Sequence, residues 1–192
     1  MKRLALPIFV SWAFVSSLSG QEMTAKRIFE LAKLPDDRSV VPEALQVFVQ
    51  ATEYVSRMII ATPDGNRVER MFWAKEKLVN GTYIVTTGRP PGSLGEMIMI
   101  TWYDNFTQTY RKAVCMNVPR PPAVHHSIGI RLQDTHTLSW TGVGILAGTW
   151  LSIERHSPEK ATFREIYLSN GRITKTIIGE SVPTKRPRQK KK

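Results

Sequence analysis

Apolar and polar residues alternate in short stretches along most of the chain after residue 51, and turn-forming residues separate these stretches. A period of two is typical of half-buried β-strands, and closely spaced turns are typical of β-meanders. The pattern predicts strands over residues 52–61, 68–75, 82–87, 96–103, 108–116, 125–132, 137–141, 149–155, 161–168 and 173–178. The strongest hairpin signals are Asn80-Gly81 and Asn170-Gly171, because Asn and Gly readily adopt the positive φ angles of primed turns.

The short connections between these strands favour antiparallel pairing and argue against a parallel sheet with crossover helices. One strand, Glu96 to Tyr103, is apolar on both faces, so one face should meet a core or cavity and the other a helix or partner. A closed barrel removes the exposed edges of such a sheet. The sequence therefore predicts an all-β fold, an antiparallel up-and-down β-barrel of about 8–10 strands over residues 51–182.

Residues 21–50 have a different pattern, because Ile28, Leu31 and Ala32 recur at helical spacing and Pro35 interrupts them. Pro42 stands where a first helical residue would, before Glu43 to Val49. Two short helices are predicted here. We expect this helical segment to cover either the outer face of the sheet or one end of the barrel.

The first twenty residues have the pattern of a secretory signal peptide. Lys2 and Arg3 precede an apolar stretch over residues 4–15, and the small residues Ser17 and Ser19 follow it. Cleavage is expected near Ser19 or Gly20, which predicts a secreted or periplasmic protein. An uncleaved N-terminal anchor is the alternative, although the apolar stretch is short for a membrane span.

Cys115 is the only cysteine. A lipoprotein needs a cysteine directly after the cleavage site, and none stands there, so a lipid anchor is not expected. An internal disulfide needs two cysteines, so the domain must derive its stability from its core. We expect Cys115 to be a buried, small hydrophobic residue.

The formal net charge of +11 is concentrated at the ends of the chain. Residues 183–192 form a basic tail that is predicted to be disordered, and its six cations are Lys185, Arg186, Arg188, Lys190, Lys191 and Lys192. The tail is either a solvated end or an electrostatic tether to anionic lipid, wall polymer or nucleic acid. The remaining body is close to neutral, so specific nucleic-acid binding is not predicted.

No catalytic or metal-binding motif stands out. His125 and His126 are adjacent on a predicted strand and therefore point to opposite faces. Glu154, Glu159 and Glu165 are spread over two predicted strands and a turn beside Arg155 and Arg164, which predicts cross-strand ion pairs. We therefore expect no catalytic residues, no metal and no cofactor.

Aromatic residues are the best indication of a binding site. Trp73, Trp102, Tyr110 and Trp150 are spread over four predicted strands and could line a pocket in a barrel. Arg111 could anchor an anionic headgroup. The alternative for the aromatic residues is ordinary core packing, because tryptophan is highly buried on average.

The stretch from residue 68 to 178 resembles a bacterial family of exported domains of unknown function with lipocalin-like (calycin) barrels. Three features carry the resemblance: residues 76–83, with a charged strand and an N-G-x-Y turn; residues 101–111, with a Y-D-N turn between strands; and the closing hairpin over residues 163–178. The resemblance implies an antiparallel barrel and, at most, binding of a small apolar ligand. It implies no reaction.

Together these observations predict a secreted, non-enzymatic protein that binds a small hydrophobic or amphipathic ligand inside its barrel. The alternative is a structural or adhesion domain with a filled barrel, held to an anionic envelope surface by the basic tail. The interior of the barrel distinguishes the two predictions, because only a ligand-binding barrel needs an empty lumen.

Overall fold

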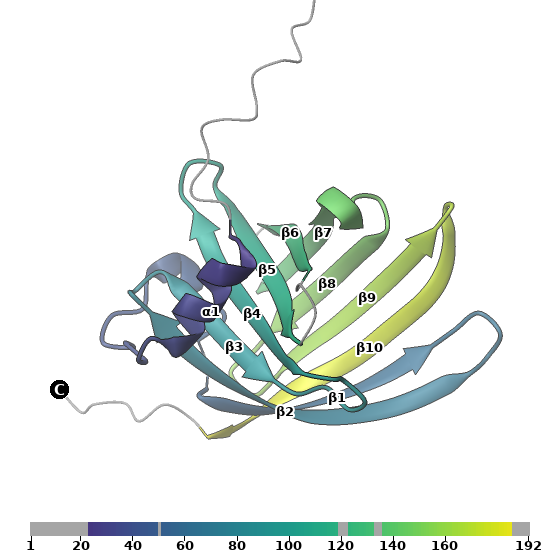
Figure 1. Ribbon diagram of the computed structural model, residues 1–192, viewed down its shortest axis with the longest axis horizontal. Helices are drawn as coiled ribbons and strands as arrows, with labels where there is room; N and C mark the ends of the chain where they lie inside the picture. The colour runs from purple at the N-terminus through teal and green to yellow at the C-terminus, as the bar shows by residue number, and fades with distance from the viewer. Residues whose placement is uncertain (1–22, 50, 119–122, 133–135, 186–192) are drawn as a thin grey trace, which may run out of the picture.

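A computed structural model describes residues 23–49, 51–118, 123–132 and 136–185 (Figure 1). The predicted signal peptide and the part of the basic tail from Arg186 onward lie outside the described residues. The strands are β1 (Glu53–Ala61), β2 (Arg67–Val79), β3 (Tyr83–Gly88), β4 (Glu96–Asp104), β5 (Thr109–Asn117), β6 (Val124–Arg131), β7 (Thr137–Val143), β8 (Trp150–His156), β9 (Ala161–Ser169) and β10 (Arg172–Lys185).

Each strand pairs antiparallel with its neighbour in sequence, and β1 also pairs with β10 to close a ten-stranded barrel. The predicted all-β barrel is therefore confirmed. The two strands that flank β1 in the barrel are longer than predicted, since β2 has 13 residues and β10 has 14. Pairing with β1 carries β10 through Pro183 to Lys185, which lies opposite Glu53, so the start of the predicted tail belongs to the sheet.

Helix α1 (Ala25–Lys33) lies across the outer face of β3, β4 and β5 (Figure 1). The Thr24 hydroxyl caps it by accepting a hydrogen bond from the Arg27 backbone N–H at 3.3 Å. Ile28 and Leu31 are fully buried against the outward side chains of this part of the sheet, and each burial contributes about 1.5–3 kcal/mol. The doubly apolar β4 thus meets a helix on its outer face, as expected.

Cys115 lies on β5 under α1 and is buried, as predicted. Burial raises the pKa of its thiol. Of the helices in the described ranges, none is long and apolar enough to cross a membrane.

The second predicted helix is reduced to a single 3₁₀ turn, η1 (Glu43–Leu45). The chain then leaves helical geometry and places Phe48 against the rings of Tyr110 and His156, with centroids 5.4 and 5.0 Å away. The Tyr110 hydroxyl donates a hydrogen bond to the Ala44 carbonyl at 3.0 Å. The N-terminal segment therefore does both things expected of it, because α1 covers a face and the η1–Phe48 segment closes one end of the barrel.

Candidate ligand site in the barrel lumen

A cavity of about 500 Å³ occupies the lumen. Its apolar lining residues include Met58, Phe72, Met97, Met99, Val114, Trp150, Phe163 and Ile177, and its polar ones include Tyr54, Glu76, Lys112, His125, Glu154, His156, Glu165 and Tyr167. Phe48 lines the cavity at the closed end, and Pro90 and Leu146 line it from connections at the opposite end. The barrel is therefore not filled by its own side chains.

Lys112 projects from β5 to the Glu154 carboxylate of β8, at 2.5 Å between Nζ and Oε1. The side chains are only 7% and 18% exposed, respectively. The Lys112 ammonium also lies 4.0 Å above the centroid of the Trp140 ring. Trp140 can lie flat here because its cross-strand neighbour is Gly129, where a Cβ would come within 2.6 Å of the indole.

Burial alone would raise the pKa of Glu154, but the Lys112 ammonium and the His156 imidazole outweigh it and hold the pKa at about 2. His156 Nε2 is 3.6 Å from Glu154 Oε2. The carboxylate is therefore ionised throughout the physiological range and neutralises the buried Lys112.

A second polar group surrounds Glu76 on β2. Arg38, from the N-terminal segment, lies between two carboxyl groups, with Asp36 at 3.0 Å from Nε and Glu76 at 3.8 Å from Nη2. Arg38 also donates hydrogen bonds to the backbone carbonyls of Ala51 and Glu76. Burial raises the pKa of Glu76 to about 8 despite the nearby guanidinium, so this carboxyl is mostly protonated at neutral pH.

A third polar group lies on β8 and β9. Glu165 accepts hydrogen bonds from the Trp150 indole N–H at 3.3 Å and the Tyr167 hydroxyl at 2.8 Å. Burial first, and then the adjacent Glu165 carboxylate, raise the pKa of Tyr167. Its hydroxyl therefore remains a proton donor.

Five buried polar atoms have no hydrogen-bond partner among the described residues: Glu76 Oε1, His125 Nδ1, Trp140 Nε1, Ser152 Oγ and His156 Nε2. Each belongs to an inward-facing side chain of the barrel. Leaving such a group unpaired costs about 1–3 kcal/mol, so buried polar atoms normally find a partner in protein, water or ligand. Of these five side chains, Glu76, His125 and His156 line the cavity, and Glu76 and His156 already face Arg38 and Glu154 at 3.8 and 3.6 Å. His125 therefore offers a polar contact to the lumen beside its apolar volume.

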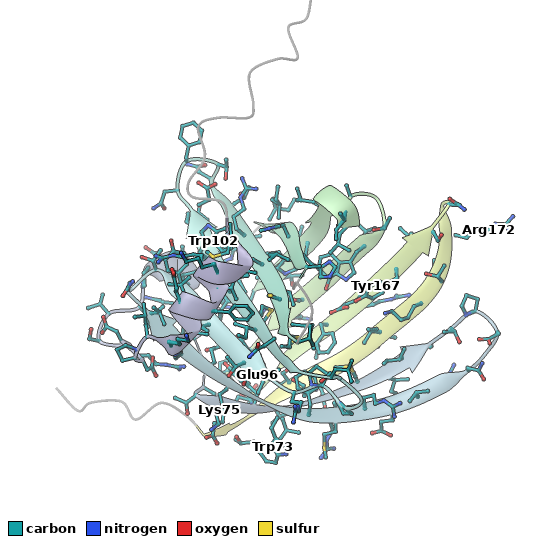
Figure 2. The ribbon with its side chains drawn as sticks, viewed as in Figure 1. Trp73, Lys75, Glu96, Trp102, Tyr167 and Arg172 are labelled. Carbon is teal, nitrogen blue, oxygen red and sulfur yellow. The ribbon has the colours of Figure 1, made fainter. Side chains whose placement is uncertain are left out.

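Of the residues predicted to bind a ligand, Trp150 lines the cavity. Tyr110 faces inward but packs against the η1–Phe48 segment. The other predictions need correction. Trp73 is 61% exposed on the outer surface of β2 (Figure 2). Trp102 packs on the outer face beside Tyr83, and Arg111 pairs with Asp104 at 3.3 Å. Strand alternation sends these three side chains outward.

The predicted surface ion pairs of Glu154 and Glu165 with neighbouring arginines are also wrong, because both glutamates face the lumen while Arg155 and Arg164 are exposed. The sequence analysis also missed the buried polar residues, because it did not identify which face of each strand points into the barrel. One sequence pattern could have indicated them. Trp150, Ser152, Glu154 and His156 share one face of β8, and this mostly polar face alternates with a second face that carries Leu151 and Ile153.

His125 faces the lumen, where it lines the cavity. Within the described ranges, no three His, Cys, Asp or Glu side chains are grouped so that they could hold a metal ion.

No family model matches the chain, and no curated protein matches it significantly. The resemblance to exported lipocalin-like domains therefore stays a prediction. The observations that bear on function are the closed barrel, its cavity and its buried charges.

Proposed function

We propose that this protein binds a small hydrophobic or amphipathic molecule in the barrel lumen. The observation that carries the proposal is the cavity of about 500 Å³ inside a closed barrel. Its volume falls within the roughly 300–1,000 Å³ of small-molecule sites, which combine apolar walls with a few polar groups. His125 lines the cavity, and its Nδ1, which has no partner among the described residues, supplies such a group.

The proposal is for binding without reaction. Lys112 is the single Lys or Arg among the described lining residues, and Glu154 neutralises it. Glu165 already accepts two hydrogen bonds from its neighbours. These contacts favour a site that holds a molecule over one that transfers a proton or attacks a bond.

Filling the lumen should abolish binding. Ala161 lines the cavity at the start of β9, so Ala161→Trp places an indole in the space that a ligand would occupy. We expect the affinity for the neutral fluorescent probe N-phenyl-1-naphthylamine to fall by at least about tenfold. Titration of probe fluorescence measures this change.

Ala147→Trp is the matched control, because Ala147 is exposed. This variant should bind the probe with the affinity of the wild type. Met58→Trp, which fills the cavity from β1, provides a second test if Ala161→Trp unfolds at a lower temperature than the wild type. Unchanged probe affinity in a folded lumen-filling variant would contradict the proposal.

A second candidate function is attachment to an anionic surface, and the outer face beside the tail favours it. Trp73 and Val182 both lie opposite Val55 and are 61% and 40% exposed. Glu53 lies opposite both Lys75 and Lys185, so the basic tail leaves the sheet beside this apolar patch. An apolar patch with adjacent cations suits a membrane surface.

Replacing Arg186, Arg188, Lys190, Lys191 and Lys192 by Gln should weaken binding to vesicles containing anionic lipid. Each cation near such a surface contributes about 1 kcal/mol, so we expect at least a tenfold loss in co-sedimentation at about 0.1 M salt. Vesicles of neutral lipid are the control. Equal binding of both proteins to anionic vesicles would exclude the tether.

A further inference from the structure

Four inward-facing residues on β8 and β9 form one compact arrangement, which we call the β8–β9 site: Trp150, Ser152, Glu165 and Tyr167. Trp150 lies opposite Tyr167 in the strand register, and Ser152 lies opposite Glu165. Two aromatic side chains therefore stand next to a carboxylate and a hydroxyl on the same inner face. Figure 2 shows Tyr167 on this inner side of the barrel.

The polar atoms of this site are incompletely used. The Trp150 and Tyr167 donors both contact Oε2 of Glu165, and neither contacts Oε1. Ser152 is 2% exposed, and its hydroxyl oxygen has no partner among the described residues. An additional hydrogen-bond donor in the cavity would find Oε1 of Glu165 as an acceptor, whereas Ser152 is not among the described residues that line the cavity.

Basic side chains elsewhere in the lumen are already neutralised. Lys112 forms its ion pair with Glu154, and Arg38 lies between Asp36 and Glu76. Glu165 has no Lys, Arg or His within ion-pair distance among the described residues. Among the glutamates that line the cavity, Glu165 is therefore the one without a cation partner in the described residues.

The site also shows that it accommodates a cation. Lys175 of β10 places its ammonium 3.7 Å from the centroid of the Tyr167 ring. The attraction between a cation and an aromatic face is stronger where water is excluded. The ring of Tyr167 thus already contacts one ammonium group, that of Lys175.

We propose that the lumen binds a lipophilic amine, whose ammonium group occupies the β8–β9 site. The ammonium has three donors, and the carboxylate of Glu165, which lines the cavity, accepts from it. The alkyl or aryl part lies along the apolar walls of the cavity. This inference rests on the proposed function, since it specifies the ligand class of the same lumen.

A carboxylate ligand fits the site poorly. Its charge would stand beside Glu165, and like charges at short distance repel strongly where water is excluded. Among the residues that line the cavity, Lys112 carries the one ammonium, and it could pair with a ligand carboxylate only by giving up Glu154; the Lys175 ammonium already lies over the Tyr167 ring. A lipid carboxylate and a lipid amine should therefore bind with different affinity despite identical tails.

The test uses three probes with the same ten-carbon tail, decylamine, decanol and decanoate, each titrated below its micelle concentration into the wild-type protein by calorimetry at pH 7. We expect decylamine to bind at least about tenfold more tightly than decanoate, with decanol between them. Glu165→Gln should weaken decylamine about tenfold and leave decanol within about twofold. Glu96→Gln, an exposed glutamate on β4, is the matched control and should change neither.

Two further variants keep the test decisive. Glu165→Asp keeps the carboxylate but draws it back from the cavity, so it should selectively weaken decylamine even if Glu165→Gln fails to fold. Lys175→Gln removes the internal cation and should tighten decylamine binding. Decanoate that binds best and is weakened by Lys175→Gln would overturn the inference and leave the proposed function standing. Failure of all three probes to bind would count against the proposed function itself.

Discussion

Glu154→Gln is expected to destabilise the barrel by about 3–5 kcal/mol, because it leaves the Lys112 ammonium buried without a carboxylate. The Lys112 side chain is 7% exposed, so bulk water replaces the lost partner poorly. Urea unfolding at pH 7, followed by far-UV circular dichroism, measures the free energy of unfolding of the variant and the wild type.

The exposed pair Lys160–Glu180 is the matched control. Its N–O distance is 3.0 Å, but its side chains are 49% and 38% exposed. Glu180→Gln should therefore cost less than about 1 kcal/mol. Lys112→Met combined with Glu154→Gln should recover most of the stability, because both charges of the pair are then removed together. Equal losses for Glu154→Gln and Glu180→Gln would show that the buried pair has no special role.

Stability should also fall as pH rises through the neutral range, and Glu76 should be the cause. Burial raises the pKa of this carboxyl from 4.5 to about 8 in the folded protein. Between those values the folded state holds a proton that the unfolded state has released. The stabilisation is complete below about pH 4.5 and is lost as pH rises through 8, with a slope of up to about 1.4 kcal/mol per pH unit.

Glu76→Gln should remove this slope, because an amide does not titrate. The backbone carbonyl of residue 76, which Arg38 contacts, is retained in the variant. Urea unfolding midpoints between pH 5 and 9 should diverge, with the variant becoming the more stable protein at the alkaline end. Parallel curves for the variant and the wild type would assign the pH dependence to another group.

Glu154 contributes the opposite dependence in acid. Its pKa is about 2 in the folded protein against 4.5 for the free side chain. Its stabilisation is therefore present above pH 4.5 and is lost as pH falls toward 2. The two glutamates of one lumen thus titrate in different ranges because their neighbours differ: Lys112 and His156 contact one, whereas Arg38 is shared between the other and Asp36.

The elements and their order can be predicted from the sequence alone. Period-two alternation and Asn-Gly turns locate the strands, and short connections between them require antiparallel neighbours. The helical spacing of Ile28 and Leu31 identifies α1 and its buried face. These properties are local, so a single sequence contains them.

Which face of each strand lies inside depends on the tertiary structure. Alternation separates Phe72 from Trp73, and Met99 from Trp102, but both faces of these strands are apolar. Closure of β1 on β10 and the position of α1 then place Phe72 and Met99 in the lumen and Trp73 and Trp102 outside. The ion pair of Lys112 with Glu154 joins residues 42 positions apart across that lumen, and such a distant contact depends on barrel curvature and register, which local patterns do not encode.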